Sequence, residues 1–290
     1  MQIGFDVGAT KIESVVLEDT GQEIFRERTD CPKDYNSVIN NIIEITKKLE
    51  KKLNKSLPVG VCHPGVHSPQ TGLIKNAPNC YWIEKKPFQK DLREALGKDV
   101  FCENDANCFA AGEKHFGIGQ NAEFLVGLVI GTGLGGGIIL DGSLYNGPNC
   151  GAGEFGMLPY RAKNIEYYCS GQFFINAGRT GEEFSKLARK SDPKALMVFK
   201  DFGLHMGNAI KVVLYTYDPD LIVLGGSISK DYDLFCESMW ESIYTFAYRS
   251  VIKTLNIKPS ETEHSAVLGA AALYLDHLKK HSKTSHYQKL

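Results

Sequence analysis

The sequence predicts a protein of two α/β domains. Strands and helices alternate along both halves of its 290 residues, which is more chain than one core usually takes. Each half opens with the same unit: an apolar strand, a glycine-rich turn carrying a threonine, and a second apolar strand. The copies lie near residues 2–18 and 124–140. A repeat of this kind favours two similar domains with a small-molecule site in the cleft between them.

The glycine turns indicate what that molecule is. The first turn reads Asp6-Val7-Gly8-Ala9-Thr10-Lys11, and the second runs from Gly131 to Gly137. Glycine lets backbone N–H groups come close to an anion, which suits a polyphosphate. We therefore expect the two turns to face one nucleotide.

Other interpretations of the second turn are weaker. Residues 131–136 match the dinucleotide-binding pattern G-x-G-x-x-G, but that pattern needs a helix directly after it. Here residues 137–140 continue as a strand into a tight turn at Asp141-Gly142. No G-x-x-x-x-G-K-S/T occurs, so a P-loop is excluded. A purely structural role for both glycine turns stays open.

Composition excludes several partners. The chain is 43% hydrophobic and 23% charged, and its 33 basic and 34 acidic residues leave a net charge of −1. We expect no nucleic acid and no membrane as partners. Asp6 and Lys11 interrupt the first apolar stretch, which argues against a signal peptide, and the eight cysteines show no metal-like spacing. These features predict a cytoplasmic protein with reduced thiols.

The first half reads clearly along the chain. The predicted strands are near 2–8, 12–18, 23–29, 58–62 and 100–102, and the predicted helices cover about 38–53, 88–96 and 106–116. The first of these helices carries apolar residues at helical spacing from Val38 to Leu53.

A glycine-rich linker at 117–121 opens the second half. Strands at 124–130 and 221–224 and helices near 181–190 and 194–217 follow, the last interrupted or bent around Gly203 and Gly207. We expect the closing helix, 265–278, to return to the first domain. The predicted domains are therefore a discontinuous small lobe, 1–117 plus about 266–290, and a large lobe, 118–265.

The segment Glu103-Asn104-Asp105-Ala106-Asn107 is the main catalytic candidate. It lies between a buried strand and a helix, and ligands of α/β sheets bind at the carboxyl ends of strands. Asp105 could accept a proton from a hydroxyl that attacks a phosphoryl group. The alternative, equally open here, is that Asn104 or Asp105 only caps the helix.

Three further polar residues could contact a sugar. Glu154 lies among small residues in a confined turn, Glu166 precedes two tyrosines, and Asn79 precedes Tyr81-Trp82. Each also has a structural explanation, as a turn residue or as a helix-start glutamate. The histidines of the loop His63-Pro64-Gly65-Val66-His67 read as incidental.

Taken in order, these motifs resemble the ROK (repressor, open reading frame, kinase) family of sugar kinases over essentially the whole chain. The motifs are Asp6–Lys11, Pro64-Gly65, Asn79, Glu103–Asn107, Gly131–Gly137, Gly151–Gly156 and Leu224-Gly225-Gly226. The resemblance implies a two-lobed, actin-like, hexokinase-type ATPase fold that closes over Mg-ATP and a hexose.

The resemblance also implies roles for these residues. Asp105 would be the base for the sugar 6-hydroxyl, and Asp6 would orient hydrated Mg²⁺. The other sugar contacts would be Gly65, Asn79, Asn104, Glu154 and Glu166. The nucleotide would be held by Gly8, Thr10, Lys11, Thr132, Gly133, Gly225 and Gly226.

One departure from the family concerns zinc. Many members carry a histidine and a cysteine-rich segment that bind structural zinc, but here the histidine position is Met157 and residues 151–168 contain no cysteine. A thioether and backbone groups do not make the usual tetrahedral zinc site. We therefore expect a kinase without structural zinc, and the loss of the histidine also changes the sugar side of the pocket.

Among function classes, an ATP-dependent sugar kinase is favoured. Family repressors carry a helix-turn-helix domain ahead of the sugar-binding body, whereas here the glycine turn unit begins at residue 2. A sugar sensor without catalysis is not supported, because Asp6, Asp105 and Thr132 are all present. Overall similarity favours N-acetylmannosamine as the substrate, with N-acetylglucosamine and glucose as alternatives, and relatives are commonly homodimers.

Overall fold

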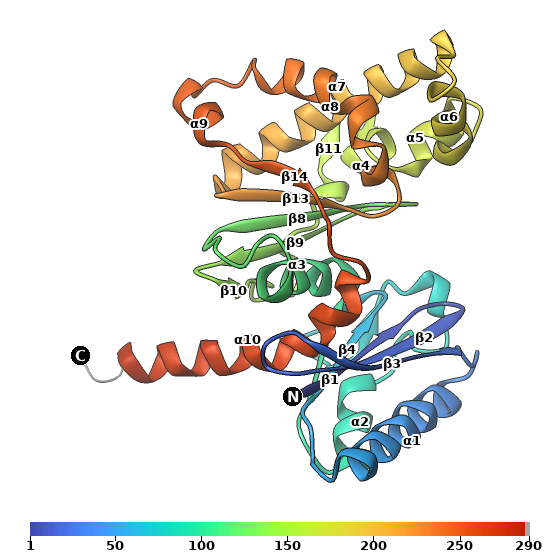
Figure 1. Cartoon of the computed structure of the whole chain (residues 1–290), viewed down its shortest axis with the longest axis vertical. Helices are drawn as coiled ribbons and strands as arrows, with labels where there is room; N and C mark the ends of the chain where they lie inside the picture. Colours follow the sequence, from blue (N-terminus) through green and yellow to red (C-terminus); the bar gives the residue numbers. More distant parts are fainter. Residues whose placement is uncertain (288–290) are drawn as a thin grey trace. The chain divides into compact units, whose positions relative to one another are not determined.

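A computed structural model describes the backbone of residues 1–287 and the side chains of residues 1–279. The chain divides into two compact units (Figure 1). Unit 1 comprises Met1–Gln120, Ser143–Ala152 and Thr262–Leu290, and unit 2 comprises Asn121–Gly142 and Gly153–Glu261. The predicted lobes differ from these units chiefly in the segment Ser143–Ala152 and by a few residues at the boundaries near 118–120 and 262–265, and their bounds stay a prediction. Residues 288–290 of the predicted small lobe lie outside the described residues.

Unit 1 is built on a mixed five-stranded sheet of order β3-β2-β1-β4-β7. Strands β1 and β2 and strands β2 and β3 pair antiparallel, whereas β1, β4 and β7 run parallel. Its elements are β1 (Gln2–Val7), β2 (Lys11–Leu17), β3 (Glu23–Asp30), α1 (Tyr35–Leu53), β4 (Val59–His63), β5 (Val66–His67), β6 (Ile74–Lys75), η1 (Pro78–Cys80), α2 (Phe88–Leu96), β7 (Val100–Asn104), α3 (Asp105–Phe116), β10 (Ser143–Leu144) and α10 (Ser265–Tyr287).

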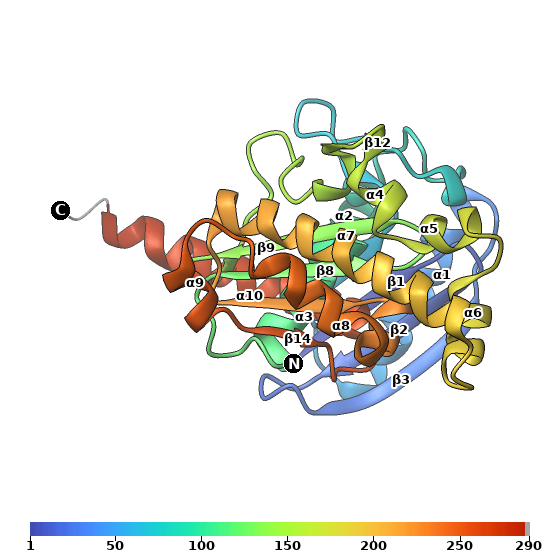
Figure 2. The same ribbon diagram turned by 90° about the horizontal axis from the view of Figure 1, so that it is seen from above.

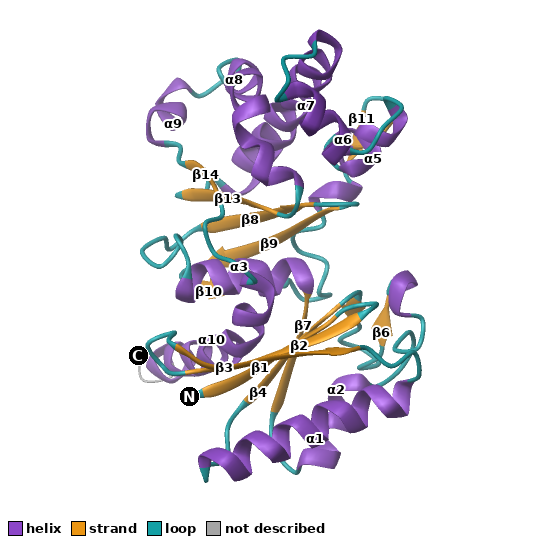
Figure 3. Cartoon of the chain, turned by 45° about the vertical axis from the view of Figure 1, so that its right-hand side comes forward, coloured by secondary structure: helices purple, strands orange, loops and turns teal. Residues whose placement is uncertain are grey.

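Helices α1 and α2 cover one face of this sheet (Figure 3). Ile42 and Leu49 of α1 and Phe88 and Leu92 of α2 are fully buried in one cluster with the inward side chains of the strands. Both helices end at a residue in the left-handed conformation, and at Gly97 (φ 64°) glycine adopts it without strain. The predicted helix 88–96 is confirmed.

Helix α10 packs on the other face at very close range. A Cβ atom added to Gly60 of β4 would lie 1.7 Å from the backbone oxygen of Ala270. A Cβ added to Gly4 of β1 would lie 2.4 Å from the oxygen of Val267. The helix contributes small side chains here, with Ala271 fully buried. Backbone-to-backbone packing of this kind tolerates no larger residue at these two glycines.

Unit 2 contains a sheet whose strands run in the order β9-β8-β13-β14, with β8, β13 and β14 parallel and β9 antiparallel to β8. Its elements are β8 (Leu125–Ile130), β9 (Leu134–Leu140), η2 (Phe155–Met157), β11 (Pro159–Tyr160), β12 (Lys163–Asn164), α4 (Ile165–Tyr168), α5 (Gly171–Asn176), α6 (Gly181–Ala188), α7 (Pro193–Tyr217), β13 (Leu221–Gly225), η3 (Ile228–Asp231), α8 (Tyr232–Ile243), α9 (Arg249–Thr254) and β14 (Ile257–Pro259).

Helix α7 corrects one expectation. The sequence predicts an interruption around Gly203 and Gly207, but α7 is helical throughout, and Figure 2 shows it as one long helix beside α8. A Cβ at Gly203 would meet the oxygen of Phe235 at 2.4 Å, and one at Gly207 would meet the oxygen of Met239 at the same distance. The glycines therefore serve close packing of two helices and do not break one.

The predicted repeat is confirmed. Strands β1 and β2 form one antiparallel hairpin, and β8 and β9 form the other. The first strand of each hairpin pairs in parallel with a later strand, β4 in unit 1 and β13 in unit 2. The glycine-rich segment near 131–136 is followed by a strand and not by a helix, as the sequence indicates.

Within the part of the chain that the structure describes, no helix is both long and apolar enough to cross a membrane. All eight cysteines are free thiols.

Candidate active site

Parallel strands carry the first group of candidate residues to one edge of the unit 1 sheet. Asp6 of β1 lies in register with Cys62 of β4, which lies in register with Glu103 of β7. Asp105 follows two residues later. Burial raises the pKa of Asp6 to about 6, and the charges of Asp105 and Glu13 add to this rise. Two of the predicted functional carboxylates are therefore neighbours.

At the start of α3, Asn104 caps the helix and the adjacent Asp105 is the candidate base. Asn104 is the N-cap, and its side-chain oxygen accepts a hydrogen bond from the Asn107 backbone N–H at 2.7 Å. Asp105 is the first residue of the helix, and its Oδ1 accepts from the Ala106 N–H at 2.9 Å. Its side chain reaches solvent, yet the surrounding protein atoms desolvate the carboxylate and raise its pKa. The capping requirement is met by Asn104, which leaves Asp105 available for chemistry.

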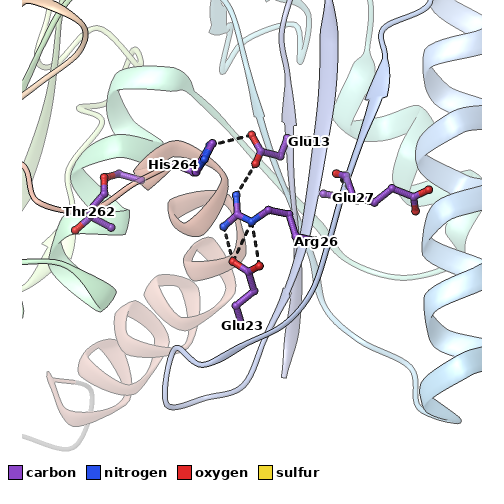
Figure 4. A network of polar contacts seen from close by, with 8 residues as sticks. Glu13, Glu23, Arg26, Glu27, Thr262 and His264 are labelled. Carbon is purple, nitrogen blue, oxygen red and sulfur yellow. Dashed lines mark hydrogen bonds and ion pairs between the residues drawn. The ribbon is translucent and has the colours of Figure 1, made fainter.

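A network of polar side chains surrounds Glu13, the residue next to Asp6 across the β1–β2 hairpin (Figure 4). Glu13 lies opposite Asp6 in the β1–β2 pairing and forms an ion pair with Arg26, and its Oε2 lies 3.2 Å from His264 Nδ1. Arg26 is itself held by Glu23 through its Nε at 3.0 Å. Because Arg26 already pairs with Glu13 and burial disfavours charge on Asp6, Asp6 is the carboxylate of this pair that is left to respond to a ligand.

Gly65 and Asn79 come from one tightly packed loop region. Gly65 has a φ of +82°, and a Cβ there would lie 2.5 Å from the Lys75 backbone oxygen. The segment after Lys75 leads directly into η1, where Asn79 is exposed. The close approach at Gly65 therefore fixes the loop that carries Asn79.

The two loop histidines are a finding that the sequence interpretation missed. His63 Nδ1 lies 3.0 Å from the Pro64 carbonyl oxygen, and His63 Nε2 lies 3.1 Å from His67 Nδ1. Burial lowers the pKa of His63 to about 3 and that of His67 to about 4. Histidine spacing alone carries no signal for this pair, because β5 (Val66–His67) must fold back before the rings can meet.

The histidine pair predicts a loss of stability in acid. Both folded pKa values lie below the ordinary value of 6.5, so the unfolded chain binds more protons between pH 6.5 and 4. The contribution is nearly complete at pH 7.5 and falls as the pH drops through 6.5, by about 3 kcal/mol for the pair between pH 7.5 and 5.5. Urea unfolding at both pH values should show this loss, and His67→Gln should roughly halve it. Equal losses in both proteins would contradict the assignment.

The predicted phosphate contacts of the first glycine turn, Gly8, Thr10 and Lys11, have different surroundings. The turn closes through the Gly8 N–H, which donates to the Lys11 oxygen at 2.9 Å, and Thr10 is exposed. The Lys11 ammonium forms an ion pair with Asp30, its partner across β2 and β3. Lys11 is therefore engaged on the sheet.

The second glycine turn lies against Glu166. The Gly131 N–H donates to the Gly133 oxygen at 3.0 Å, and the Leu134 N–H donates to Glu166 Oε2 at 3.0 Å. A Cβ on Gly133 would lie 2.6 Å from the same oxygen. The N-cap of α4 is Asn164, so Glu166 is joined to the glycine turn and does not cap its helix.

A cavity of about 720 Å³ opens beside this turn in unit 2. Gly131 and Thr132 line it on one side, and Ser227 and Ile228 line it just after Gly225-Gly226. Gly226 has a φ of +86°, and a Cβ there would lie 2.3 Å from the Ile130 oxygen, so it holds the end of β13 against the end of β8. The cavity joins two predicted nucleotide-binding segments that are about ninety residues apart in the sequence.

Further residues line the same cavity that the sequence analysis did not find. They come from α5, α6 and η3 and include Gln172, Ile175, Thr180, Lys186 and Asp231. These residues carry no motif, because only the packing of the three segments brings them together.

The last candidates lie around η2 and α4. Glu154 is exposed and precedes η2, and Met157, at the position of the family histidine, is 55% exposed. Behind them Tyr160 and Tyr168 pack with His205, and the Tyr160 hydroxyl lies 3.1 Å from His205 Nδ1. Among the described residues, no three His, Cys, Asp or Glu side chains are grouped so that they could hold a metal ion.

The glycine hairpin on each of the two sheets and the aspartate at the start of α3 are the features that the sequence resemblance implies for a hexokinase-type fold. The model of the ROK family matches residues 2–277, and the chain belongs to this family.

Curated relatives agree with this membership. N-acetyl-D-glucosamine kinase of Histophilus somni is 32% identical over 304 residues, which cover 95% of this chain and 99% of the relative. Glucokinase of Thermotoga maritima is 27% identical over 306 residues, 93% of this chain and 96% of the relative. The chain is therefore a sugar kinase of the ROK family.

Solved structures agree on the fold. The ROK hexokinase from Thermus thermophilus has a TM-score of 0.85 with 25% identity, and the match covers 96% of this chain and 99% of the other. A ROK family glucokinase from Streptomyces griseus, in complex with glucose and AMPPNP, has a TM-score of 0.75 with 24% identity, covering 94% and 98%.

Proposed function

We propose that this protein transfers the γ-phosphoryl group of ATP to the 6-hydroxyl of an N-acylhexosamine. The observation that carries the proposal is the accessible carboxylate of Asp105 beside an Asn104 that already caps the helix. In this proposal Asp105 accepts the proton of the 6-hydroxyl, the hydroxyl oxygen bonds to the γ-phosphorus, and ADP leaves. Positioning dominates such a reaction, since the protein forms no covalent bond with the substrate.

Magnesium fits the residues around Asp6. Burial raises the pKa of Asp6, and the charges of Asp105 and Glu13 add to this rise, so a bound cation would favour its charged form. Carboxylate oxygens are the ligands that Mg²⁺ prefers. When bound with ATP, Mg²⁺ would supply charge stabilisation to the transferring phosphoryl group. We assign Asp6 to hold it, through water.

The unit 2 cavity is the proposed nucleotide site. Its volume suits a nucleotide, and the ATP analogue bound to the Streptomyces glucokinase shows that this fold accepts one. Thr132 and Gly133 would contact the phosphates, with Gly8, Thr10 and Lys11 from the other hairpin, and Gly225-Gly226 would admit the adenosine. The ion pair of Lys11 with Asp30 would have to open for that contact.

The sugar is assigned by class. Gly65, Asn79, Asn104, Glu154 and Glu166 are the proposed contacts. Sequence resemblance favours N-acetylmannosamine, whereas the Histophilus relative acts on N-acetylglucosamine, so we place these two epimers ahead of glucose. The protein is proposed to be a cytoplasmic homodimer.

A coupled ADP-release assay with Mg-ATP tests the proposal. The panel contains N-acetylmannosamine, N-acetylglucosamine, glucose, mannose and fructose. We expect kcat/KM to be highest for one of the two N-acetyl sugars. Highest activity on glucose would restrict the proposal to a glucokinase, and no turnover on any sugar by folded protein would refute it.

Zinc content gives an independent prediction. Met157 and the cysteine-free segment 151–168 lack the donors of the family zinc site, and the Tyr160–Tyr168–His205 cluster packs the region instead. Protein purified without added metal should contain well under one zinc per chain by elemental analysis, and chelator treatment should leave the melting temperature unchanged. Stoichiometric zinc would refute this prediction.

A further inference from the structure

Unit 1 contains a cavity of about 410 Å³ that plays no part in the proposed reaction. The loop after β5, helix α2, strand β7, the segment 143–152 and helix α10 all contribute to its wall. Its charged and polar lining includes His67, Gln89, Arg93, Glu103, Asp276 and His277. The volume lies in the range of small-molecule sites.

The histidine pair leaves one acceptor at this cavity without a partner. His63 is neutral, and its Nδ1 must donate to the Pro64 oxygen, since a carbonyl only accepts. His63 Nε2 is then a lone pair and accepts from His67 Nδ1. His67 Nε2 is consequently also a lone pair, and this buried atom has no hydrogen-bond partner among the described residues. Because His67 lines the cavity, a hydroxyl or N–H of an occupant would satisfy this acceptor once the ring turns toward it.

Arg93 supplies the opposite chemistry. Its Nε donates to the Val100 oxygen at 3.1 Å, which fixes the guanidinium at the cavity wall. No described residue accepts from its two terminal nitrogens or forms an ion pair with it. Arg93 lies near enough to His67 for its charge to lower the pKa of that histidine. A cation with two free donor nitrogens therefore lies close to a free acceptor.

Two carboxylates restrict the charge of an occupant. Glu103 accepts hydrogen bonds from the side chains of Asn107, at 2.9 Å, and Asn146. Asp276 is buried and accepts from the Leu144 N–H at 3.0 Å. Their negative charges would repel a second acidic group on an occupant.

We propose that this cavity binds a sugar derivative bearing one acidic group, with the acid on Arg93 and a hydroxyl on His67 Nε2. The acid can be a phosphate or a carboxylate, since both pair with a guanidinium. The inference goes beyond the proposed kinase reaction and does not depend on it. An occupant would touch Glu103, whose Oε2 accepts from the Asn104 N–H at 3.3 Å, directly before the candidate base.

Calorimetric titration of the full chain tests this site without relying on activity. The probes are glucose 6-phosphate, gluconate, glucose and inorganic phosphate. The variant is Arg93→Gln, and the matched control is Lys90→Gln, which removes the same charge from an exposed position of the same helix. Because sugars could also occupy the candidate active site, the readout is the difference between the two variants.

We expect at least one sugar anion to bind the wild type and Lys90→Gln alike and to lose about tenfold or more in affinity in Arg93→Gln. Dependence on Arg93 for glucose 6-phosphate alone assigns a sugar phosphate, and for gluconate alone a sugar acid. Affinity for both anions that does not change in Arg93→Gln would overturn the proposal. So would inorganic phosphate binding as tightly as glucose 6-phosphate with the same dependence, because the site would then ignore hydroxyls.

Melting curves check that Arg93→Gln folds. Should it fail, Arg93→Lys replaces it, since lysine keeps the charge but lacks the planar fork that holds an acid by two parallel hydrogen bonds. A loss of about threefold or more is expected there, and an unchanged affinity would count against the site.

Discussion

Replacing Asp105 with Asn is expected to lower kcat at least ~100-fold while the fold stays intact. The amide keeps the hydrogen bond to the Ala106 N–H but cannot take the hydroxyl proton. Steady-state kinetics with Mg-ATP and the preferred sugar would measure the loss. Because desolvation by the surrounding protein atoms raises the pKa of Asp105, the acid limb of the wild-type kcat/KM profile should lie above the ordinary aspartate range. Activity should fall as the pH drops through that pKa.

The control for this variant is the neighbouring cap. Asn104→Ala removes the hydrogen bond to the Asn107 N–H and should cost ~1 kcal/mol of stability, which Asp105→Asn should not. A near-normal rate in Asp105→Asn, or a stability loss like that of the cap variant, would give Asp105 a structural role.

Asp6→Asn is expected to abolish activity and yet to stabilise the protein. At pH 7 the fold must hold Asp6 charged against a pKa of about 6, well above that of an unfolded aspartate. This costs ~1–3 kcal/mol, which the neutral amide removes. The sign follows from linkage: the folded state binds the Asp6 proton more tightly, so this contribution grows more favourable as the pH falls from about 6 to 4. Urea unfolding without nucleotide would measure the gain.

Asp99→Asn provides the matched comparison, since Asp99 is exposed and its change should leave the unfolding free energy within about 0.5 kcal/mol. If Asp6→Asn were less stable than the wild type at pH 7, the claim that the charged form of Asp6 destabilises the fold would be wrong.

The sequence predicted best the elements whose pattern lies within one short segment. Helix α2 occupies the predicted range 88–96, because Phe88 and Leu92 face one core and Gly97 stops the helix. Both hairpins follow from an apolar strand on each side of a glycine turn. These signals are local, so one chain segment contains all the information that they need.

Features that depend on distant partners were not predicted. Gly203 reads locally as a helix breaker, but its role is set by α8, which lies more than thirty residues further on. Lys186 and Gln172 line the large cavity only because α5 and α6 pack beside Gly131. The catalytic candidates were found by their motif. Which of Asn104 and Asp105 caps the helix is decided by a hydrogen bond, and the residue pattern alone does not show it.

The contact of Gly4 and Gly60 with α10 has a consequence for the order of synthesis. Strands β1 and β4 are among the first sixty-three residues made, but the helix that covers their second face begins only at Ser265. The ribosome must therefore deliver all of unit 2 before unit 1 can close. A nascent chain that stops short of this helix leaves an apolar sheet face exposed, which makes it a substrate for chaperones or for aggregation.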